Sequence, residues 1–478
     1  MTTITVLLLT VSVKNLYAQK TSLQDCFNIA KEKNILINQS KTSLLAKQYN
    51  LDAAKQSYLP KVDLLASYTY LSRPLEVNLQ TVKDGIVTGS SQQAVNTANS
   101  IYQQITGNTL PQSVQDQIYN SSKNIISAAY PNYNPALSQQ SYFLAGVGVR
   151  QPIYLGNKLT TATNFAQSEV NSALIGTQLV EKDVNYAIAL QYIRILYLNT
   201  ILRTQEQVVA SFKKNEEYAE ELVKNQILPP YQKSWTKVVL SQARTNYSNL
   251  QLDKKNALVE MNKMLGVPLD SVLTITDTLA YTTKNNTGLQ DNFWENNPTF
   301  QLVQSKIATA QTTEKLARSM SLPNVFAVGN LNLVQNNLPV TIAPWLVGVE
   351  MQWTIFNGTQ TSKRQKAAQQ LVQEVRQAEE NTKQNLQVQL QVIVNKIEGA
   401  KNEINTMDSA RVDIATTRNL INERMINQLS SVKDVNDAIL IQAETDKAYY
   451  TAVLGYYIAI ATYWNIVGSP QRITEIIR

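Results

Sequence analysis

An internal repeat constrains the fold of this chain more than any other feature of its sequence. The segment GVGVRQPIYLG (146–156) aligns without gaps on GVEMQWTIFNG (348–358), at an offset of 202 residues. The same offset aligns further pairs of residues: Gly266 with Gly468, Pro268 with Pro470, and Gln226 with Gln428. We therefore expect two structural repeats, residues 20–270 and 289–478, joined by a linker at 271–288.

Each half is predicted to contain a helix, two strands, a long helix and a shorter return helix. The predicted elements are 22–57, 61–71, 142–154, 158–226 and 231–265 in the first half, and 290–319, 324–334, 345–356, 360–427 and 433–465 in the second. At 1.5 Å per residue, each long helix is roughly 100 Å long. The pattern predicts an α+β fold in which each half is a two-helix rod with a strand pair at one end.

The two halves differ between their strands, where the first half carries additional residues. These fall within 76–140, a stretch rich in Ser, Thr, Asn and Gln with few charges. Such a composition is typical of a surface loop, and we expect a long loop with some local structure. Because the segment interrupts nothing that is repeated, we also expect it to be dispensable for the fold.

The strand predicted at 345–356 has one apolar face and one mostly polar face. The apolar side chains alternate along it as Trp345, Val347, Val349, Met351, Trp353 and Ile355. Four strands cannot close a barrel, for which about eight are the minimum, whereas three copies supply twelve strands and leave no open edge. The apolar face would then contact lipid, the polar face would line a lumen, and Trp345 and Trp353 would lie at the two membrane interfaces. The core of a β-sandwich would also accommodate two tryptophans, so these two residues alone do not distinguish a sandwich from a membrane barrel.

The second long helix carries the apolar repeat of a coiled coil. Leucine, isoleucine, alanine and methionine recur at three- and four-residue spacings from Leu386 to Met425, and Arg411 and Arg418 interrupt the series. In a trimer, twelve such helices side by side would continue the barrel as a hollow tube.

Residue composition excludes most enzymes. The chain has no histidine and one cysteine, Cys26, so it lacks a Ser-His-Asp triad, a Cys-His nucleophile and most kinds of zinc site. The sequence also shows no phosphate-binding glycine loop and no metal-ligand cluster, and we predict no catalytic activity, metal or cofactor. The net charge of +7 is spread along the chain without a basic run, which argues against nucleic acid as a partner.

Residues 1–19 are predicted to be a signal peptide. ITVLLLTVSV is a short apolar segment, and Ala18 provides a small residue at a cleavage point. No later segment approaches 18 consecutive apolar residues, so no transmembrane helix is predicted. If the exported protein crosses a membrane, we expect it to do so as a barrel.

Across nearly its whole mature length the sequence resembles the TolC-like family of outer membrane efflux proteins. Members have two tandem halves, with strand pairs that end in turns like Gln151–Gly156 and Trp353–Gly358 and helices that end like Met264–Pro268 and Ile466–Pro470. The resemblance implies a homotrimer with a twelve-stranded transmembrane β-barrel, four strands per chain, continued in the periplasm by a long α-helical coiled-coil barrel. It also implies docking onto a periplasmic adaptor (membrane fusion) protein and an inner-membrane pump.

By this resemblance, the turns at the ends of the long helices dock the adaptor. The residues concerned are Asn225, Gln226, Ile227, Leu228, Pro229 and Pro230 in the first half, and Asn427, Gln428, Leu429, Ser430 and Ser431 in the second. Family members usually carry glycine at the positions of Gln226 and Gln428. The arginine that latches the entrance in some members falls at Ser430, so that latch is expected to be absent.

The segment KDVNDA (433–438) matches a family motif whose two acidic residues ring the tunnel entrance. Here these residues are Asp434 and Asp437, three apart on one helix face, and a trimer would gather six carboxylates at one constriction. Two other interpretations stay open: Ser431 and Asp434 also match a capping box, and Asp437 also fits a solvated surface residue. The first half has no acidic residue at either equivalent position, so any ring must come from the second half.

These observations predict the exit duct of a tripartite efflux or type I secretion system in the outer membrane. Its helices would extend into the periplasm, and the segment 76–140 would face the cell exterior. The pump chooses the cargo, so the sequence does not distinguish these systems or identify the substrate. The alternative is a soluble periplasmic coiled-coil adaptor or structural protein, which would share the long hairpins but would not need four alternating strands.

Overall fold

The computed structural model describes residues 21–130, 135–136, 138–275, 277–282, 288, 291–338 and 340–477. The predicted signal peptide therefore lies outside the described residues, as does part of the predicted linker. The chain divides into two compact units, and both take residues from both halves of the repeat. The helical unit consists of the described residues within 1–55, 160–318 and 358–478, and the strand unit of those within 56–159 and 319–357.

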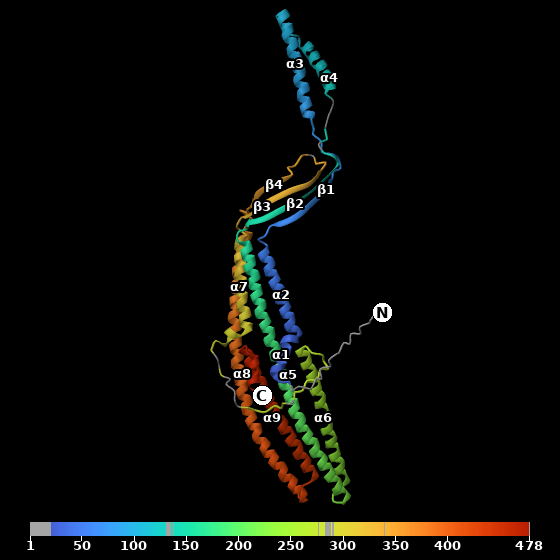
Figure 1. Ribbon diagram of the computed structural model, residues 1–478, viewed down its shortest axis with the longest axis vertical. Helices are drawn as coiled ribbons and strands as arrows, with labels where there is room; N and C mark the ends of the chain where they lie inside the picture. The colour runs from blue at the N-terminus through green and yellow to red at the C-terminus, as the bar shows by residue number, and fades with distance from the viewer. Residues whose placement is uncertain are drawn as a thin grey trace, which may run out of the picture. The chain divides into compact units, whose positions relative to one another are not determined.

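The helical unit is built around the two long helices that the sequence predicts. α5 and α8 each contain 67 residues, and each is followed by a return helix, α6 or α9 (Figure 1). The bounds are α1 Leu23–Lys33, α2 Ile35–Gln56, α5 Lys158–Lys224, α6 Pro230–Leu265, α7 Pro298–Ser319, α8 Gln360–Ile426 and α9 Val432–Ile466, with 3₁₀ turns at Phe293–Asn296 and Pro470–Glu475. None of the helices in the described part of the chain is both long enough and apolar enough to cross a membrane.

Two helices that were predicted to be continuous are interrupted by an asparagine. The predicted helix 22–57 is divided at Asn34 into α1 and α2, and within 290–319 a 3₁₀ turn precedes Asn297 and α7 follows it. Asparagine competes for backbone hydrogen bonds with its own side chain, which favours a break between helices. The spacing of the apolar residues does not reveal such a break.

Each interrupting asparagine attaches the first helix of its half to the end of the return helix. The Nδ2 of Asn34 donates to the carbonyl of Met264, and the Nδ2 of Asn297 donates to the carbonyl of Ile466 at 2.7 Å. Met264 and Ile466 are equivalent in the repeat. Both halves therefore close in the same way, through one buried side chain.

Glycines end the return helices at these contacts. Gly266 has a φ of +72°, and a Cβ on it would overlap the carbonyl oxygen of Lys33. Gly468 has a φ of +90°, and a Cβ on it would lie 2.8 Å from the carbonyl oxygen of Asn296. Both the left-handed backbone and the close approach require glycine, which explains why the repeat keeps it at this position.

Buried apolar side chains in the helical unit form two clusters. The main cluster includes Tyr192, Ile193, Tyr456 and Tyr463, from α5 and α9, none of them more than 1% exposed. A smaller group, here called the tip cluster, consists of Val208, Phe212, Ala219, Leu240, Ala243, Met425, Val432, Val435 and Ile439. The tip cluster holds the two helical hairpins together near their turns.

The described residues of the strand unit form one antiparallel sheet with the strand order β1-β2-β3-β4. The strands are β1 Lys61–Tyr70, β2 Ser141–Tyr154, β3 Asn324–Asn336 and β4 Trp345–Gln352. All four predicted strands are confirmed, although β4 ends four residues before the predicted 356. β1 and β4 are the two edges of this sheet, and each leaves one side of its backbone unpaired.

The register of the sheet gathers the apolar residues on one face. Val62 lies opposite Val149, Leu64 opposite Val147, and Val349 opposite Ala327. Paired residues share a face of the sheet, so the apolar faces predicted separately for the strands coincide. Most of these side chains remain exposed in the single chain, with Val347 77% exposed. The opposite face carries Lys61, Asp63, Arg150, Asn330 and Glu350.

The segment 76–140 differs from the predicted long loop. It contains two helices, α3 Gln80–Thr106 and α4 Gln112–Ala129, which pack together as a hairpin (Figure 1). Glu76 and Ala136 form a β-bridge at its base. Val87, Ser91 and Val95 are buried in the hairpin at a spacing of four residues. Only two of these three residues are apolar, so the helical period is weak in the sequence.

Candidate functional site

The two turns predicted to dock an adaptor have the same backbone structure. Each long helix ends in a Schellman motif, in which two N–H groups after the helix donate to carbonyls of its last turn. The bonds run from Gln226 to Val223, Ile227 to Leu222, Gln428 to Met425 and Leu429 to Arg424. The residue before each glutamine, Asn225 or Asn427, closes a further bond to Glu221 or Glu423.

Glutamine occupies a left-handed conformation in both turns. The φ angles are 61° at Gln226 and 58° at Gln428. A residue with a Cβ costs about 1 kcal/mol or more in this region compared with glycine. Both turns therefore have the left-handed backbone that glycine favours, although glutamine stands where the family resemblance leads us to expect glycine.

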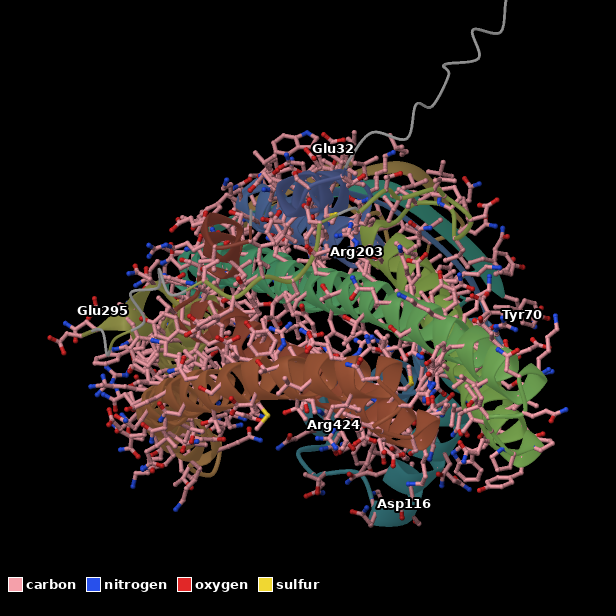
Figure 2. All side chains as sticks on the ribbon, turned by 90° about the horizontal axis from the view of Figure 1, so that it is seen from below. Glu32, Tyr70, Asp116, Arg203, Glu295 and Arg424 are labelled. Atoms are coloured by element: carbon pink, nitrogen blue, oxygen red, sulfur yellow. The ribbon has the colours of Figure 1, made fainter. Side chains whose placement is uncertain are left out.

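Most side chains of the two turns are exposed, and only those of Leu228, Ser430 and Ser431 are partly buried. Ile227 and Leu429 are exposed at equivalent positions, whereas Leu228 packs against the tip cluster. Pro229 caps α6 and Pro230 begins it. Arg424, labelled in Figure 2, covers the second turn by donating from Nη2 to the carbonyl of Leu429 at 3.2 Å and from Nε to Oγ of Ser430 at 3.3 Å.

Asp434 is engaged in the capping box at the start of α9. Its carboxylate accepts the N–H of Ser431 at 2.8 Å, and its own N–H donates to Oγ of Ser431 at 3.1 Å. These hydrogen bonds lower the pKa of the exposed Asp434 carboxyl. Its contribution to stability is therefore complete above the unfolded-state pKa and is lost as the pH falls through the lower folded-state pKa. The capping box predicted for Ser431 and Asp434 is confirmed. The role of Asp434 at a pore constriction stays a prediction.

Asp437 is paired within its own helix. Nζ of Lys433 donates to its Oδ2 at 2.7 Å, across one helical turn; Lys433 is largely exposed and Asp437 is about half exposed. This pairing raises the pKa of Lys433. The predicted site did not include Lys433, although the spacing of four residues in KDVNDA could have identified it. A ring built from these residues would carry a lysine for every two carboxylates.

The equivalent part of the first hairpin has a different chemistry. Gln232 and Trp235 replace the two acids, and Oε1 of Gln232 is buried without a hydrogen-bond partner among the described residues. Trp235 is exposed and lines a shallow groove of about 510 Å³ with Tyr231, Val238 and Val432. At equivalent positions of the repeat, the first hairpin therefore presents an aromatic surface and the second hairpin an acidic one.

Buried polar side chains connect the two hairpins inside the tip cluster. Nδ2 of Asn215 on α5 donates to Oδ1 of Asn436 on α9 at 2.6 Å, and Nδ2 of Asn436 donates to Oγ1 of Thr236 on α6 at 3.4 Å. Arg418 on α8 donates to Ser211 of α5 at 2.8 Å and to Gln442 of α9 at 2.7 Å. Sequence reasoning missed these partners, because only Arg418 stands out from the apolar spacing.

The other arginine that interrupts the apolar repeat is also paired. Nε of Arg411 donates to Oδ1 of Asp446 at 2.6 Å, and its guanidinium lies 4.2 Å from the ring centre of Tyr449. The hydrogen bond and the charge of Asp446 raise the pKa of Arg411 against the opposing effect of burial. Both arginines thus stay in the seam of the α8–α9 coiled coil because α9 supplies polar partners.

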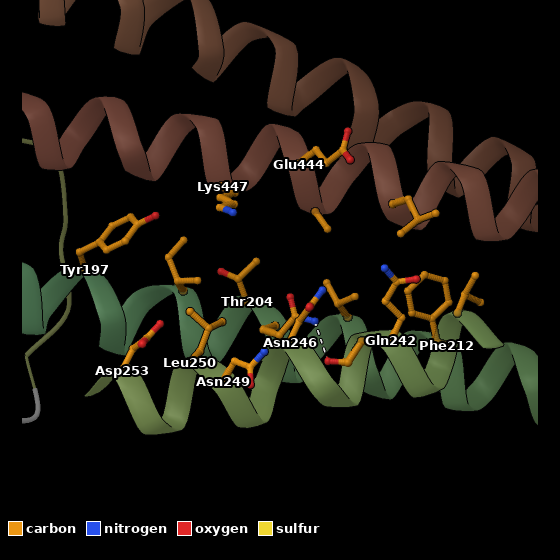
Figure 3. Close-up of a pocket in the computed structure, with 17 residues that line it drawn as sticks. Tyr197, Thr204, Phe212, Gln242, Asn246, Asn249, Leu250, Asp253, Glu444 and Lys447 are labelled. Atoms are coloured by element: carbon orange, nitrogen blue, oxygen red, sulfur yellow. Dashed lines mark hydrogen bonds between the residues drawn. The ribbon is translucent and has the colours of Figure 1, made fainter. Parts of the chain in front are cut away.

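A cavity of about 590 Å³ lies between α5, α6 and α9 (Figure 3). Its wall contains apolar side chains of both core clusters, such as Leu250 and Phe212, together with charged ones, Asp253, Glu444 and Lys447. The cavity marks the boundary between the main cluster and the tip cluster. In the described parts of the chain, no group of three or more Cys, Asp or Glu residues is arranged to hold a metal ion.

The two tryptophans predicted at membrane interfaces lie at opposite ends of β4. Trp345 begins the strand opposite Leu331, and Trp353 follows its last residue. Both side chains are exposed, and Nε1 of Trp353 donates to the carbonyl of Ser321 at 3.0 Å. Their positions bracket the apolar face of β4. Their place in a membrane remains a prediction.

Comparison with solved structures identifies the fold. The Campylobacter jejuni CmeC outer membrane channel is 13% identical over 93% of this chain and 85% of its own, with a TM-score of 0.69. The outer membrane protein VceC of Vibrio cholerae is 14% identical over 95% of this chain and 97% of its own, with a TM-score of 0.68. For the Neisseria gonorrhoeae MtrE outer membrane channel the identity is 13%, the coverage 94% and 89%, and the TM-score 0.69.

The comparisons by sequence are negative. No family model matches the chain, and no curated protein matches it. At identities of 13–14%, the likeness to solved structures shows the fold and leaves the activity to be argued from the residues. The resemblance to TolC-like proteins inferred from sequence motifs is confirmed at the level of the fold, which is that of outer membrane channels.

Proposed function

We propose that this protein, with the fold of an outer membrane channel, is the exit duct of a tripartite efflux or type I secretion system. The observation that carries the proposal is the sheet, which has an exposed apolar face and two unpaired edges, β1 and β4. Open edges and an uncovered apolar face are both unfavourable in water. Three copies in a membrane remove both problems, because β4 of one copy pairs with β1 of the next and lipid covers the apolar face.

The polar face of the sheet would line the lumen of the resulting twelve-stranded barrel. Arg150 lies on this face, 3.5 Å from Glu350, with its guanidinium 3.8 Å from the ring centre of Phe326. Lys61 and Asp63 are on the same face at the same end of the sheet. These groups suit a water-filled lumen and would be costly against lipid. The helical unit would then form the periplasmic extension.

We expect the mature protein to purify from outer membranes as a trimer. The chain should remain in the membrane pellet after salt and alkali washes, because its contact with lipid is apolar. Detergent should release a particle with three times the mass of the mature chain, measured by light scattering with correction for bound detergent. A monodisperse monomer that stays soluble without detergent would contradict the proposal and favour the soluble adaptor.

We propose that the turns 225–230 and 427–431 dock the adaptor. α5 rises about 100 Å along its own axis from Lys158 to the first turn, so this turn lies at the end of the helix that is not joined to β2. The exposed pair Ile227 and Leu429 is better suited to contact a partner than Leu228, which packs in the tip cluster. The pump that stands behind the adaptor would determine the cargo.

Cysteines at the turns should cross-link to the adaptor in cells. We expect adducts from Ile227→Cys and Leu429→Cys with a short bifunctional thiol reagent, and a weaker adduct from Leu228→Cys, because Leu228 is partly buried against the tip cluster. Mass spectrometry of the adduct would identify the adaptor. Adducts formed only from residues of the strand unit, for example Thr69→Cys, would place the docking surface elsewhere.

A further inference from the structure

The base of the α3–α4 hairpin carries an exposed apolar stripe. Leu79, Val82 and Ile86 follow a spacing of three and four residues, so they share one face of the helix. Val82 is 57% exposed, and the other two are also exposed. The face of α3 that carries Val87, Ser91 and Val95 is buried, and at about 100° per residue it is turned well away from Val82. The stripe is therefore left uncovered by the hairpin's own packing.

The hairpin is almost without charge, and its other exposed large apolar side chains are Ile101, Tyr102 and Ile105 toward the end of α3 and Ile125 on α4. Among residues 80–129 the only charged side chains are Lys83, Asp84, Asp116 and Lys123, two of each sign. A neutral surface does not repel a second copy of itself and offers little attraction to anionic groups of a membrane surface. A stripe of exposed apolar residues on such a surface favours burial against another protein surface.

The topology of the sheet indicates which protein surface covers the stripe. The hairpin leaves the sheet after Tyr70, the last residue of the edge strand β1, which pairs with Ser141. The same end of the sheet carries the turn between β3 and β4, because Phe143 pairs with Asn336 at the end of β3. That turn contains Val340, which is 64% exposed. When β4 of one copy pairs with β1 of the next, its turn is brought to the base of the next copy's hairpin.

We propose that the stripe Leu79, Val82 and Ile86 is an interface for the neighbouring copy of this chain, and that the β3–β4 turn around Val340 of that copy covers it. The contact rests on the proposed trimer and assigns a role to the insertion: it stabilises the pairing of β1 with β4 of the neighbouring copy at the end of the sheet where β1 ends and β4 begins. The strand pairing holds the two copies together by itself. Deleting 80–129 should therefore leave trimers that form but dissociate at a lower temperature.

Disulfide trapping tests the contact directly. In the variant Val82→Cys with Val340→Cys, oxidation of the purified detergent-solubilised protein should give covalent dimers and trimers on a denaturing gel without reductant. The natural Cys26 is buried and does not compete. The matched control is Thr97→Cys with Val340→Cys, because Thr97 is exposed on α3 but about 22 Å farther along it. The control should stay monomeric on the gel, and a bond within one chain would also leave a monomer.

Trimer stability provides a second readout. Val82→Asp with Ile86→Asp should lower the temperature at which the trimer dissociates by several degrees, since two exposed apolar residues would become charged at the interface. Ile105→Asp is the control, because Ile105 is 77% exposed near the far end of α3 and lies outside the stripe. It should dissociate at the wild-type temperature.

The outcomes separate this inference from the proposed function. A trimeric wild type with no cross-link at Val82 and an unchanged dissociation temperature for the aspartate variant would overturn the contact and leave the channel intact. Stronger quenching of a Val82→Trp variant than of the wild type by brominated lipid would also overturn it, since the added tryptophan in the stripe would then face lipid. A monomeric wild type would overturn the proposed function together with the contact.

Discussion

Replacing Gly266 by alanine is expected to lower the free energy of unfolding of the helical unit by on the order of 4 kcal/mol or more. The left-handed φ of +72° costs about 1–2 kcal/mol for a residue with a Cβ. The new methyl group would also overlap the carbonyl of Lys33, which is backbone and has little room to move because Asn34 is hydrogen bonded to Met264. Denaturant unfolding of the trimer followed by helical circular dichroism measures the loss.

Two other glycines serve as matched controls for this substitution. Gly358 has a φ of +65° and no atom within 4 Å of the position that an added methyl group would take, so Gly358→Ala should cost only about 1–2 kcal/mol. Gly468 has a φ of +90° and approaches Asn296 less closely than Gly266 approaches Lys33, so Gly468→Ala should fall between the two. Equal losses at Gly266 and Gly358 would show that the backbone angle alone, and not the close approach, requires glycine.

Neutralising Asp434 and Asp437 is expected to remove cation block and reduce cation selectivity in the closed channel. In the proposed trimer, the two residues contribute six carboxylates and the three copies of Lys433 offset half of that charge. The remaining negative field attracts cations and repels anions. The variant Asp434→Asn with Asp437→Asn removes the charge and keeps an oxygen that can accept the N–H of Ser431. Single-channel recording in planar bilayers, with and without polyvalent cations, measures both effects.

Lys433→Gln changes the charge of the ring in the opposite direction and serves as the control in the same experiment. It leaves the capping box intact and frees Asp437 from its ion pair, so cation selectivity and cation block should both increase. In the wild type, block should weaken as the pH falls and Asp434 protonates, and this loss should need a lower pH than an ordinary aspartate would, because the hydrogen bonds of the capping box lower the pKa of Asp434. Unchanged block and selectivity in both variants would assign the two acids to capping and surface pairing, and the entrance filter would lie elsewhere.

The sequence alone determined the elements that depend on local periodicity. The strands alternate with a period of two, so the apolar faces could be assigned before their partners were known, and the sheet register places those faces together. The long helices repeat every three and four residues, and their ends are marked by proline or serine, so α5 and α8 could be located to within a few residues. The offset of 202 residues also aligns Gln226 with Gln428, and both residues stand in the same hydrogen-bonded turn at the end of a long helix.

Tertiary structure decided what depends on residues far apart in the chain. The breaks at Asn34 and Asn297 exist because each side chain reaches a carbonyl at the end of a return helix, 230 and 169 residues away. The bond between Asn215 and Asn436 likewise joins residues 221 positions apart. The α3–α4 hairpin was not predicted from the sequence because few apolar residues mark its buried face. Spacing along a chain reports which side of an element is apolar, but only packing determines which distant polar groups meet and which apolar surface remains uncovered.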